Sequence, residues 1–402
     1  MSVTVPSIHH HILFHRHGYG LNLSHQFPNY REDPNACNSY GTTPLHVLCL
    51  TNDYCEVADE LIKSGAQVNA ANHFGSTPLH FAVIHRNEWM VRVLIEHGAD
   101  VNLQDMNGNA ALHFAVRNSK TLLYLPEHQT GDLWIVQKLI NNGADIDIFN
   151  KDYETPLMWA IREDGMDIVK ELLAFGANVN TRKDGLETCL HVASRNIKPN
   201  SDIIIELVKH GACINCLDQD GKTALDVLLQ SRNPGYGFKS AKALIKVATL
   251  MNFEHEINFR VTKESLTLNE FIRKCSEEVL SMKSIVYAEK FSLCHFALNG
   301  GYNINHGNPS EESIFDKVLD TLSNYTFPIY HDILAANFER SYLCEKVQKL
   351  NIYARNERGY ANISLNHDVI SKISCSLSDG DLINFIRAYT KSVVPLSDDD
   401  AV

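Results

Sequence analysis

A four-residue phrase repeated at nearly constant intervals is the feature that most constrains this chain. Thr-Pro-Leu-His occurs at Thr43–His46 and at Thr77–His80. Degenerate copies of the phrase follow at Ala110–His113, Thr155–Met158, Thr188–His191 and Thr223–Asp226. The first residues of successive copies are separated by 34, 33, 45, 33 and 35 residues. A period near 33 residues is typical of stacked repeats, in which each unit buries its apolar face against its neighbours.

Residues 75–108 show how one unit is expected to fold. Thr77 suits the N-cap of a helix, and Pro78 suits the first helical position because its missing N–H costs nothing there. Apolar residues within 90–95 recur at helical spacing and predict a second helix. Gly98 suits the left-handed residue that follows the end of this helix. Each unit is therefore predicted to be a pair of helices followed by a turn.

A second pattern marks the exit from each pair: Gly-Ala, then a polar or charged residue or a cysteine, then Val or Ile. Further copies start at Gly65, Gly143, Gly176 and Gly211. Phrase, period and exit together resemble the ankyrin repeat over residues 33–250. The resemblance implies an all-α fold, with about six repeats stacked as a solenoid whose concave face binds a target protein. Residues 1–32 are expected to form an N-terminal cap or decayed repeat.

Composition narrows the classes of partner. The 402 residues carry a net charge of −12, which argues against a large nucleic-acid-binding face. No apolar run reaches the length of a membrane span, and the first residues lack the basic and apolar regions of a secretory signal. The ten cysteines lack disulfide-framework spacing, which predicts reduced thiols. We therefore expect a cytoplasmic protein, with the nucleus left open, and no nucleic-acid or membrane partner.

Catalytic and metal-binding patterns are weak in this sequence. Four histidines lie in the repeated phrase (His46, His80, His113 and His191), and His97 and His210 lie at expected helix ends, where structural hydrogen bonds account for them. Cys213-x-x-Cys216 has no second pair at zinc spacing. No arrangement of a nucleophile with a histidine and an acid stands out. The sequence predicts a protein that is not an enzyme and that holds no metal or cofactor.

Two departures from the repeat pattern are candidate contacts with a partner. The third unit contains a 12-residue insertion, Ser119–Thr130, which is either a partner-binding protrusion or a loop packed on itself. Its apolar residues are Leu122, Leu123, Tyr124 and Leu125. Aromatic residues also occur near the expected finger tips, which are the turns that precede the repeated phrase. Tyr40, Phe74 and Tyr153 either bind a partner along one edge or pack on neighbouring fingers.

The C-terminal third is expected to be a helical domain over residues 251–390, followed by an acidic tail over 391–402. An amphipathic helix is predicted at 271–283, and apolar residues at helical spacing recur from 369 to 377 and from 382 to 386. The residues that carry a further resemblance are Cys275, Glu278, Met282, Lys283, Phe327–Tyr330 and the segment that begins at Leu365. Together they look like a PRANC domain, the module that follows ankyrin repeats in proteins of poxviruses, parasitoid wasps and some intracellular bacteria.

The end of this domain is similar to a shortened F-box, whose helices dock on the Skp-family adaptor of cullin ubiquitin ligases. By position, the resemblance implies a docking face of Leu365, Val369, Ile373, Leu377, Leu382, Phe385 and Ile386. Asn366 departs from the proline usual in this motif. The alternative is that these helices cap the solenoid.

Two functions follow from these resemblances. One is an effector-like adaptor that brings a target protein, bound on the repeats, to a Skp–cullin–F-box ligase in a host cell. The other is an inhibitor or scaffold, for example of a transcription factor, with no link to a ligase.

Overall fold

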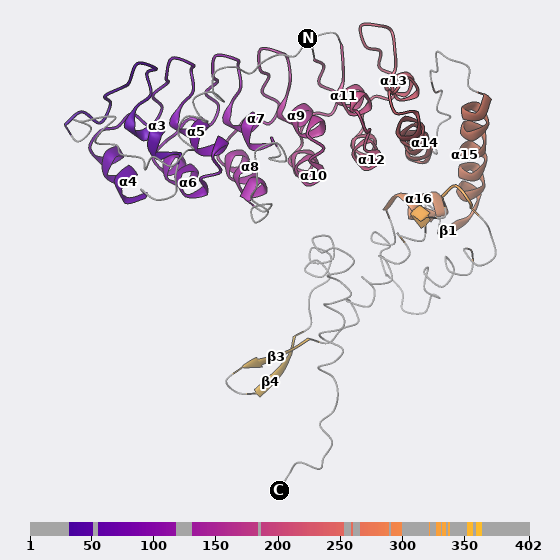
Figure 1. The fold of residues 1–402 in the computed structure, drawn as a ribbon. Helices are drawn as coiled ribbons and strands as arrows, with labels where there is room; N and C mark the ends of the chain where they lie inside the picture. Colours follow the sequence, from indigo (N-terminus) through magenta and orange to yellow (C-terminus); the bar gives the residue numbers. More distant parts are fainter. Residues whose placement is uncertain are drawn as a thin grey trace. The chain divides into compact units, whose positions relative to one another are not determined.

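Pairs of short helices follow one another along the first half of the computed structural model (Figure 1). The first helices of the pairs are α3 (Pro44–Leu48), α5 (Pro78–Ile84), α7 (Ala111–Ala115), α9 (Pro156–Arg162), α11 (Cys189–Arg195) and α13 (Ala224–Leu229). The second helices are α4 (Cys55–Lys63), α6 (Glu88–Glu96), α8 (Gly131–Asn141), α10 (Met166–Ala174), α12 (Ser201–Lys209) and α14 (Pro234–Met251). We call the pairs the first to sixth units.

The structure describes residues 32–50, 55–117, 131–183, 186–252, 259, 266–288, 291–299, 321, 327–330, 332–334, 337, 352–356 and 359–363. The residues from Leu122 to Leu125 of the insertion and those from Leu365 to Ile386 of the predicted docking face lie outside this part of the chain. By its internal contacts the chain divides into two compact parts. One is Met1–Leu244 with Phe259–Lys263, and the other is Ile245–Asn258 with Glu264–Val402.

The ends of the helices follow from the sequence as predicted. Thr77 has extended backbone angles (φ −94°, ψ 167°) and caps α5, and Pro78 is the first residue of that helix. Helix α6 ends at its C-cap His97, and Gly98 follows with φ +82°. Glycine adopts this left-handed conformation without the steric cost that other residues meet.

The core is a column of leucines, one from each repeated phrase. They are Leu45, Leu79, Leu112, Leu157, Leu190 and Leu225, and each is buried. Burial of each leucine contributes on the order of 2 kcal/mol. Each first helix packs on the first helices of neighbouring units, and second helices pack on one another in the same way. Figure 1 shows the resulting two rows of helices.

Histidines of the repeated phrase connect the first, second, third and fifth units each to the unit that follows. The backbone N–H of Thr43 donates to Nδ1 of His46 (3.2 Å), so Nε2 carries the ring hydrogen and donates to the carbonyl of Ser76 in the second unit (2.9 Å). His80, His113 and His191 make the equivalent bond to the carbonyls of Asn109, Glu154 and Lys222, at 3.0, 3.0 and 3.1 Å. We call these bonds the histidine bridges.

Each unit begins with a finger, which is the turn that leads into its first helix. In the second unit, Oδ1 of Asn72 accepts the backbone N–H groups of Phe74 (2.9 Å) and Ser76 (3.0 Å). The N–H of Gly75 donates to the carbonyl of Asn72 (2.9 Å), and Gly75 has φ +72°. Neighbouring fingers are also joined through their backbones, as in the bond from the Met106 N–H to the Phe74 carbonyl (2.8 Å).

The second compact part contains α15 (Leu266–Ser284), which confirms the predicted amphipathic helix, and α16 (Leu293–Asn299). Two short antiparallel pairs accompany them: β1 (Val286–Ala288) with β2 (Phe291–Ser292), and β3 (Ile352–Asn356) with β4 (Gly359–Ile363). The Glu278 carboxylate of α15 accepts the N–H of Ile329 (3.1 and 3.2 Å). Among the described residues, no helix is both long and apolar enough to cross a membrane.

One expectation about cysteine was wrong. Cys213 and Cys216 are joined as a disulfide in the exit of the fifth unit, whereas composition predicted reduced thiols. The exit turn brings their Cα atoms to 5.6 Å, a separation that a disulfide can span.

Candidate functional site

Two neighbouring fingers depart from the pattern of the others in the same way. The residue two positions before the capping threonine or alanine is glycine in four units, at Gly41, Gly75, Gly108 and Gly221, and each has a φ between 71° and 75°. The fourth and fifth units have Tyr153 (φ +55°) and Leu186 (φ +65°) at this position. Large side chains adopt such angles at a cost of about 1–2 kcal/mol.

Hydrogen bonds confirm that these two residues occupy the place of the glycine. The Tyr153 N–H donates to the carbonyl of Asn150, and the Leu186 N–H to that of Lys183, both at 3.0 Å. Both side chains project into solvent, with 57% of Tyr153 and 49% of Leu186 exposed.

The three predicted finger aromatics therefore do not share one register. Tyr40 and Phe74 lie one position before the glycine of their fingers, whereas Tyr153 replaces that glycine. Tyr40 is exposed and Phe74 is half-buried. Counting back from each capping residue in the sequence would have found the shift, and it would also have found Leu186, which sequence reasoning missed.

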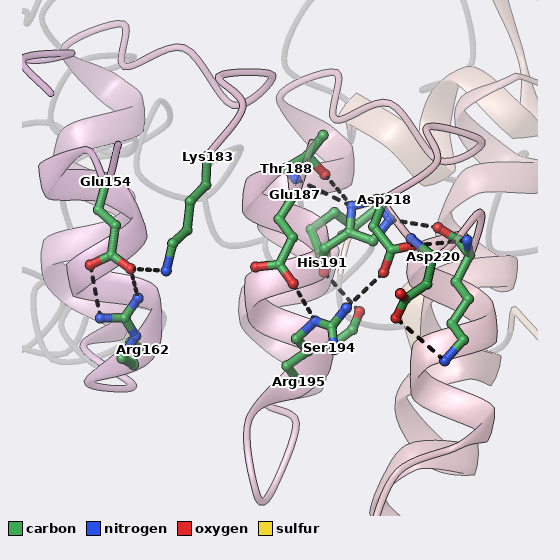
Figure 2. Close-up of polar contacts among 12 residues, drawn as sticks. Glu154, Arg162, Lys183, Glu187, Thr188, His191, Ser194, Arg195, Asp218 and Asp220 are labelled. Carbon is green, nitrogen blue, oxygen red and sulfur yellow. Dashed lines mark hydrogen bonds and ion pairs between the residues drawn. The ribbon is translucent and has the colours of Figure 1, made fainter. Parts of the chain in front are cut away.

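A buried carboxylate lies next to Tyr153. Glu154 is 5% exposed and accepts hydrogen bonds from Nε1 of Trp159 (2.8 Å), from Nη1 of Arg162 (3.0 Å) and from Nζ of Lys183 in the next finger. A second bond from Arg162 makes this pair two-pronged. Figure 2 shows the Arg162 and Lys183 groups converging on this carboxylate.

The pKa of Glu154 shows which effect dominates. Burial alone would raise it, because a charged carboxylate loses hydration. The hydrogen bonds from Arg162 and Lys183 outweigh burial, so the pKa lies below its usual value. The group is therefore ionised at neutral pH and holds both cations in place.

The fifth unit contains a related arrangement one repeat further on. Nε of Arg195 pairs with Glu187, which follows Leu186, at 2.6 Å, and Nη2 pairs with Oδ2 of Asp218 at 2.7 Å. The side chain of Asp218 is fully buried, and its Oδ1 accepts the N–H groups of Asp220 and Lys222, both at 2.9 Å. Figure 2 shows Arg195 between the two carboxylates.

A row of aromatic rings leads to this site along the first helices. Phe81, Phe114 and Trp159 take equivalent positions in the second, third and fourth units, and each is partly exposed. The rings of Phe114 and Trp159 meet edge to face, with centroids 6.1 Å apart. Each ring also lies across a bridging histidine of the preceding unit, as Trp159 does on His113 (5.4 Å).

The histidine bridge is absent between the fourth and fifth units. Met158 stands where the other bridging units have histidine, and it is buried. A further departure from the repeat coincides here, because Lys183 replaces the Asn or Asp that begins the other fingers. Departures from the finger pattern thus gather in two neighbouring units. We call the set Tyr153, Glu154, Arg162, Lys183, Leu186, Glu187, Arg195 and Asp218 the finger–arginine site.

Metal ligands do not gather in the part of the chain that the structure describes. Over those ranges, no group of three or more His, Cys, Asp or Glu side chains is arranged to hold a metal ion. The histidines of the phrase are engaged in bridges, and burial lowers their pKa, to about 4 for His46.

A family profile of ankyrin repeats agrees with this architecture. The family profile described as "Ankyrin repeats (3 copies)" matches residues 19–105, 71–130 and 127–218. No curated protein matches the chain. Among solved structures, the ankyrin repeat domain of Bcl-3, titled a unique member of the IkappaB protein family, is 27% identical with a TM-score of 0.44. That match covers 53% of this chain and 89% of the Bcl-3 chain.

The human ASB11 ankyrin repeat domain is 28% identical, with a TM-score of 0.42, over 51% of this chain and 86% of that one. The residues matched by the family profile include the first five helix pairs with their capped phrases and fingers. The predicted fold class is confirmed, and the chain carries an array of ankyrin repeats that forms a protein-binding module.

Proposed function

We propose that this protein is an adaptor whose ankyrin array binds a target protein and whose C-terminal part docks on the Skp-family adaptor of a cullin ubiquitin ligase. Target binding by the ankyrin array is supported by the surface of partly exposed aromatic and arginine side chains along the first helices. Trp159 and Arg162 belong to it, and Trp, Tyr and Arg are the residues most often found at the centres of protein interfaces.

Docking on the ligase adaptor is proposed from the resemblance of the segment from Leu365 to Ile386 to a shortened F-box. Division of the chain into two compact parts supports two binding functions in one molecule. An adaptor of this kind would raise the concentration of the target near the ligase by tethering, and the ligase would supply the chemistry. We place this activity in the cytoplasm of a host cell.

A pull-down with a purified Skp-family adaptor tests the ligase link. The full chain should retain the adaptor, and the variant Val369→Asp with Leu382→Asp should lose it. Leu280→Asp is the control, because this side chain of α15 is already 63% exposed and its replacement should leave binding unchanged.

Lack of binding by the intact chain, or equal binding by the double variant in a folded state, would remove the ligase link. The protein would then be an inhibitor or scaffold that acts through its ankyrin array alone.

A further inference from the structure

The finger–arginine site repeats one arrangement in two adjacent units. A large apolar residue takes the left-handed turn position, a glutamate follows it, and that glutamate holds an arginine at the end of the first helix. The two sets are Tyr153, Glu154, Arg162 and Leu186, Glu187, Arg195. The four other units have glycine at the turn position and no glutamate after it.

Packing within the chain does not explain why the apolar residues replace glycine. A glycine at either position would adopt the observed φ without strain. Tyr153 and Leu186 remain about half exposed, so their burial offsets little of the free energy that the left-handed backbone costs. Strain that the chain itself does not repay points to a contact with another molecule.

The charges of the site indicate the chemistry of that molecule. Glu154, Glu187 and Asp218 lie largely beneath the cations that they hold, whereas Arg162 and Arg195 are 45% and 41% exposed. Arg162 and Lys183 share the carboxylate of Glu154, and Arg195 faces those of Glu187 and Asp218, so the site is balanced in charge and its cations are the more exposed members. A partner would meet fixed cations rather than the carboxylates.

Fixed cations bind at lower entropic cost than mobile ones. The buried carboxylates already restrict the arginine side chains, so less side-chain freedom remains to be lost on binding. Guanidinium groups bind carboxylates in a planar, two-pronged geometry, and their N–H donors exceed those used within the chain. Arg195 uses Nε and Nη2 for its two carboxylates, and its Nη1 makes no bond among the described residues.

We propose that the finger–arginine site binds a segment of a partner protein in which acidic residues lie beside bulky apolar ones. Tyr153 and Leu186 contact the apolar side chains, and Arg162, Lys183 and Arg195 contact the carboxylates. The inference deepens the proposed function, because it rests on target binding by the ankyrin array and does not require the ligase link.

A phage-displayed library of random 16-residue peptides, selected on the full chain, tests the proposal. Enriched peptides should combine Asp or Glu with Trp, Phe or Leu. One of them, made synthetically with a fluorophore, then gives dissociation constants by fluorescence anisotropy. Tyr153→Gly with Leu186→Gly should weaken binding at least tenfold, and Lys183→Gln should weaken it several-fold. Raising NaCl from 50 to 500 mM should weaken it further.

Two features keep this test interpretable. Glycine is the residue that the other fingers carry, so the double variant should fold, as its circular dichroism would verify. Phe175→Ala removes an exposed aromatic side chain that follows α10 and should change affinity less than twofold.

Three outcomes would overturn the proposal: enrichment of basic peptides, failure to enrich any peptide, or an affinity that the double variant leaves unchanged. In the last case the peptide binds elsewhere on the array. Target binding by the array would then remain supported, and binding at the finger–arginine site would be refuted. The Skp-family pull-down is unaffected by any of these results.

Discussion

Lys183 donates to the carboxylate of Glu154, which lies 29 residues earlier in the chain and one repeat away. This contact joins the fourth and fifth units, where Met158 stands in place of a bridging histidine, and the two-pronged bond from Arg162 holds the carboxylate from within the fourth unit. An ion pair between a buried carboxylate and a partly exposed lysine has thus taken the place of a neutral hydrogen bond in holding these two repeats together.

Removal of that carboxylate tests its contribution. Glu154→Gln should lower the free energy of unfolding by about 1–2 kcal/mol at pH 7, less than for a fully buried pair because Arg162 and Lys183 are partly exposed to water. The folded-state pKa of Glu154 is lowered. The carboxylate therefore contributes fully to the free energy of unfolding above the usual glutamate pKa, and this contribution is lost as the pH falls from there through the folded-state pKa.

Urea unfolding at pH 7 and pH 3.5 would measure both effects, and the difference between variant and parent should shrink at the lower pH. Glu163→Gln, one residue beyond the end of α9, is the control and should change stability by less than about 0.5 kcal/mol. An equal loss from both substitutions would refute the role given to Glu154.

The histidine bridges predict that the array weakens in mild acid. Burial lowers the pKa of His46, His80, His113 and His191, so the unfolded chain binds more protons than the folded one below about pH 6.5. Stability is therefore full above the unfolded pKa and falls as pH decreases towards the folded pKa. For His46, with a pKa of about 4, the loss at pH 5 is about 2 kcal/mol.

Thermal unfolding midpoints between pH 7.5 and 4.5 would record this loss. His113→Met copies the residue that the fourth unit already carries at Met158. This variant should be less stable at pH 7.5 and should show a shallower pH dependence. The control His73→Asn alters an exposed finger histidine and should keep the slope of the parent. A slope unchanged in His113→Met would show that the bridges are not its origin.

Two finger glycines should differ in their tolerance of alanine. A Cβ atom at Gly108 would lie 2.7 Å from the backbone nitrogen of Lys151 in the next finger, whereas one at Gly221 would meet nothing within 4 Å. Both have positive φ, so Gly221→Ala measures the strain alone, about 1 kcal/mol. Gly108→Ala adds the clash and should cost about 1–3 kcal/mol more. Equal losses in chemical denaturation would contradict the close finger packing.

The repeat itself was predictable because its signals are local. Threonine caps, Pro78 and the glycine after each second helix specify helix ends within a few residues, and the period specifies the stacking. The register of Tyr153 needed only a count back from Thr155. The pairing of Lys183 with Glu154 could not be predicted, because it depends on how far one finger leans over the next. The insertion and the segment from Leu365 to Ile386 stay predictions.

Substitution of both apolar finger residues by glycine tests whether the fourth and fifth repeats have lower stability in return for binding. Glycine relieves the strain of the left-handed backbone at both positions, which stabilises the folded chain, but its greater freedom in the unfolded chain offsets part of this gain. The Tyr153→Gly, Leu186→Gly variant should therefore be more stable by about 0.5–1 kcal/mol per site. Its midpoint of thermal unfolding and its affinity for a selected acidic peptide should be measured on the same preparation. We expect a higher midpoint and at least a tenfold weaker affinity, whereas a lower midpoint or an unchanged affinity would show that Tyr153 and Leu186 are not retained for binding.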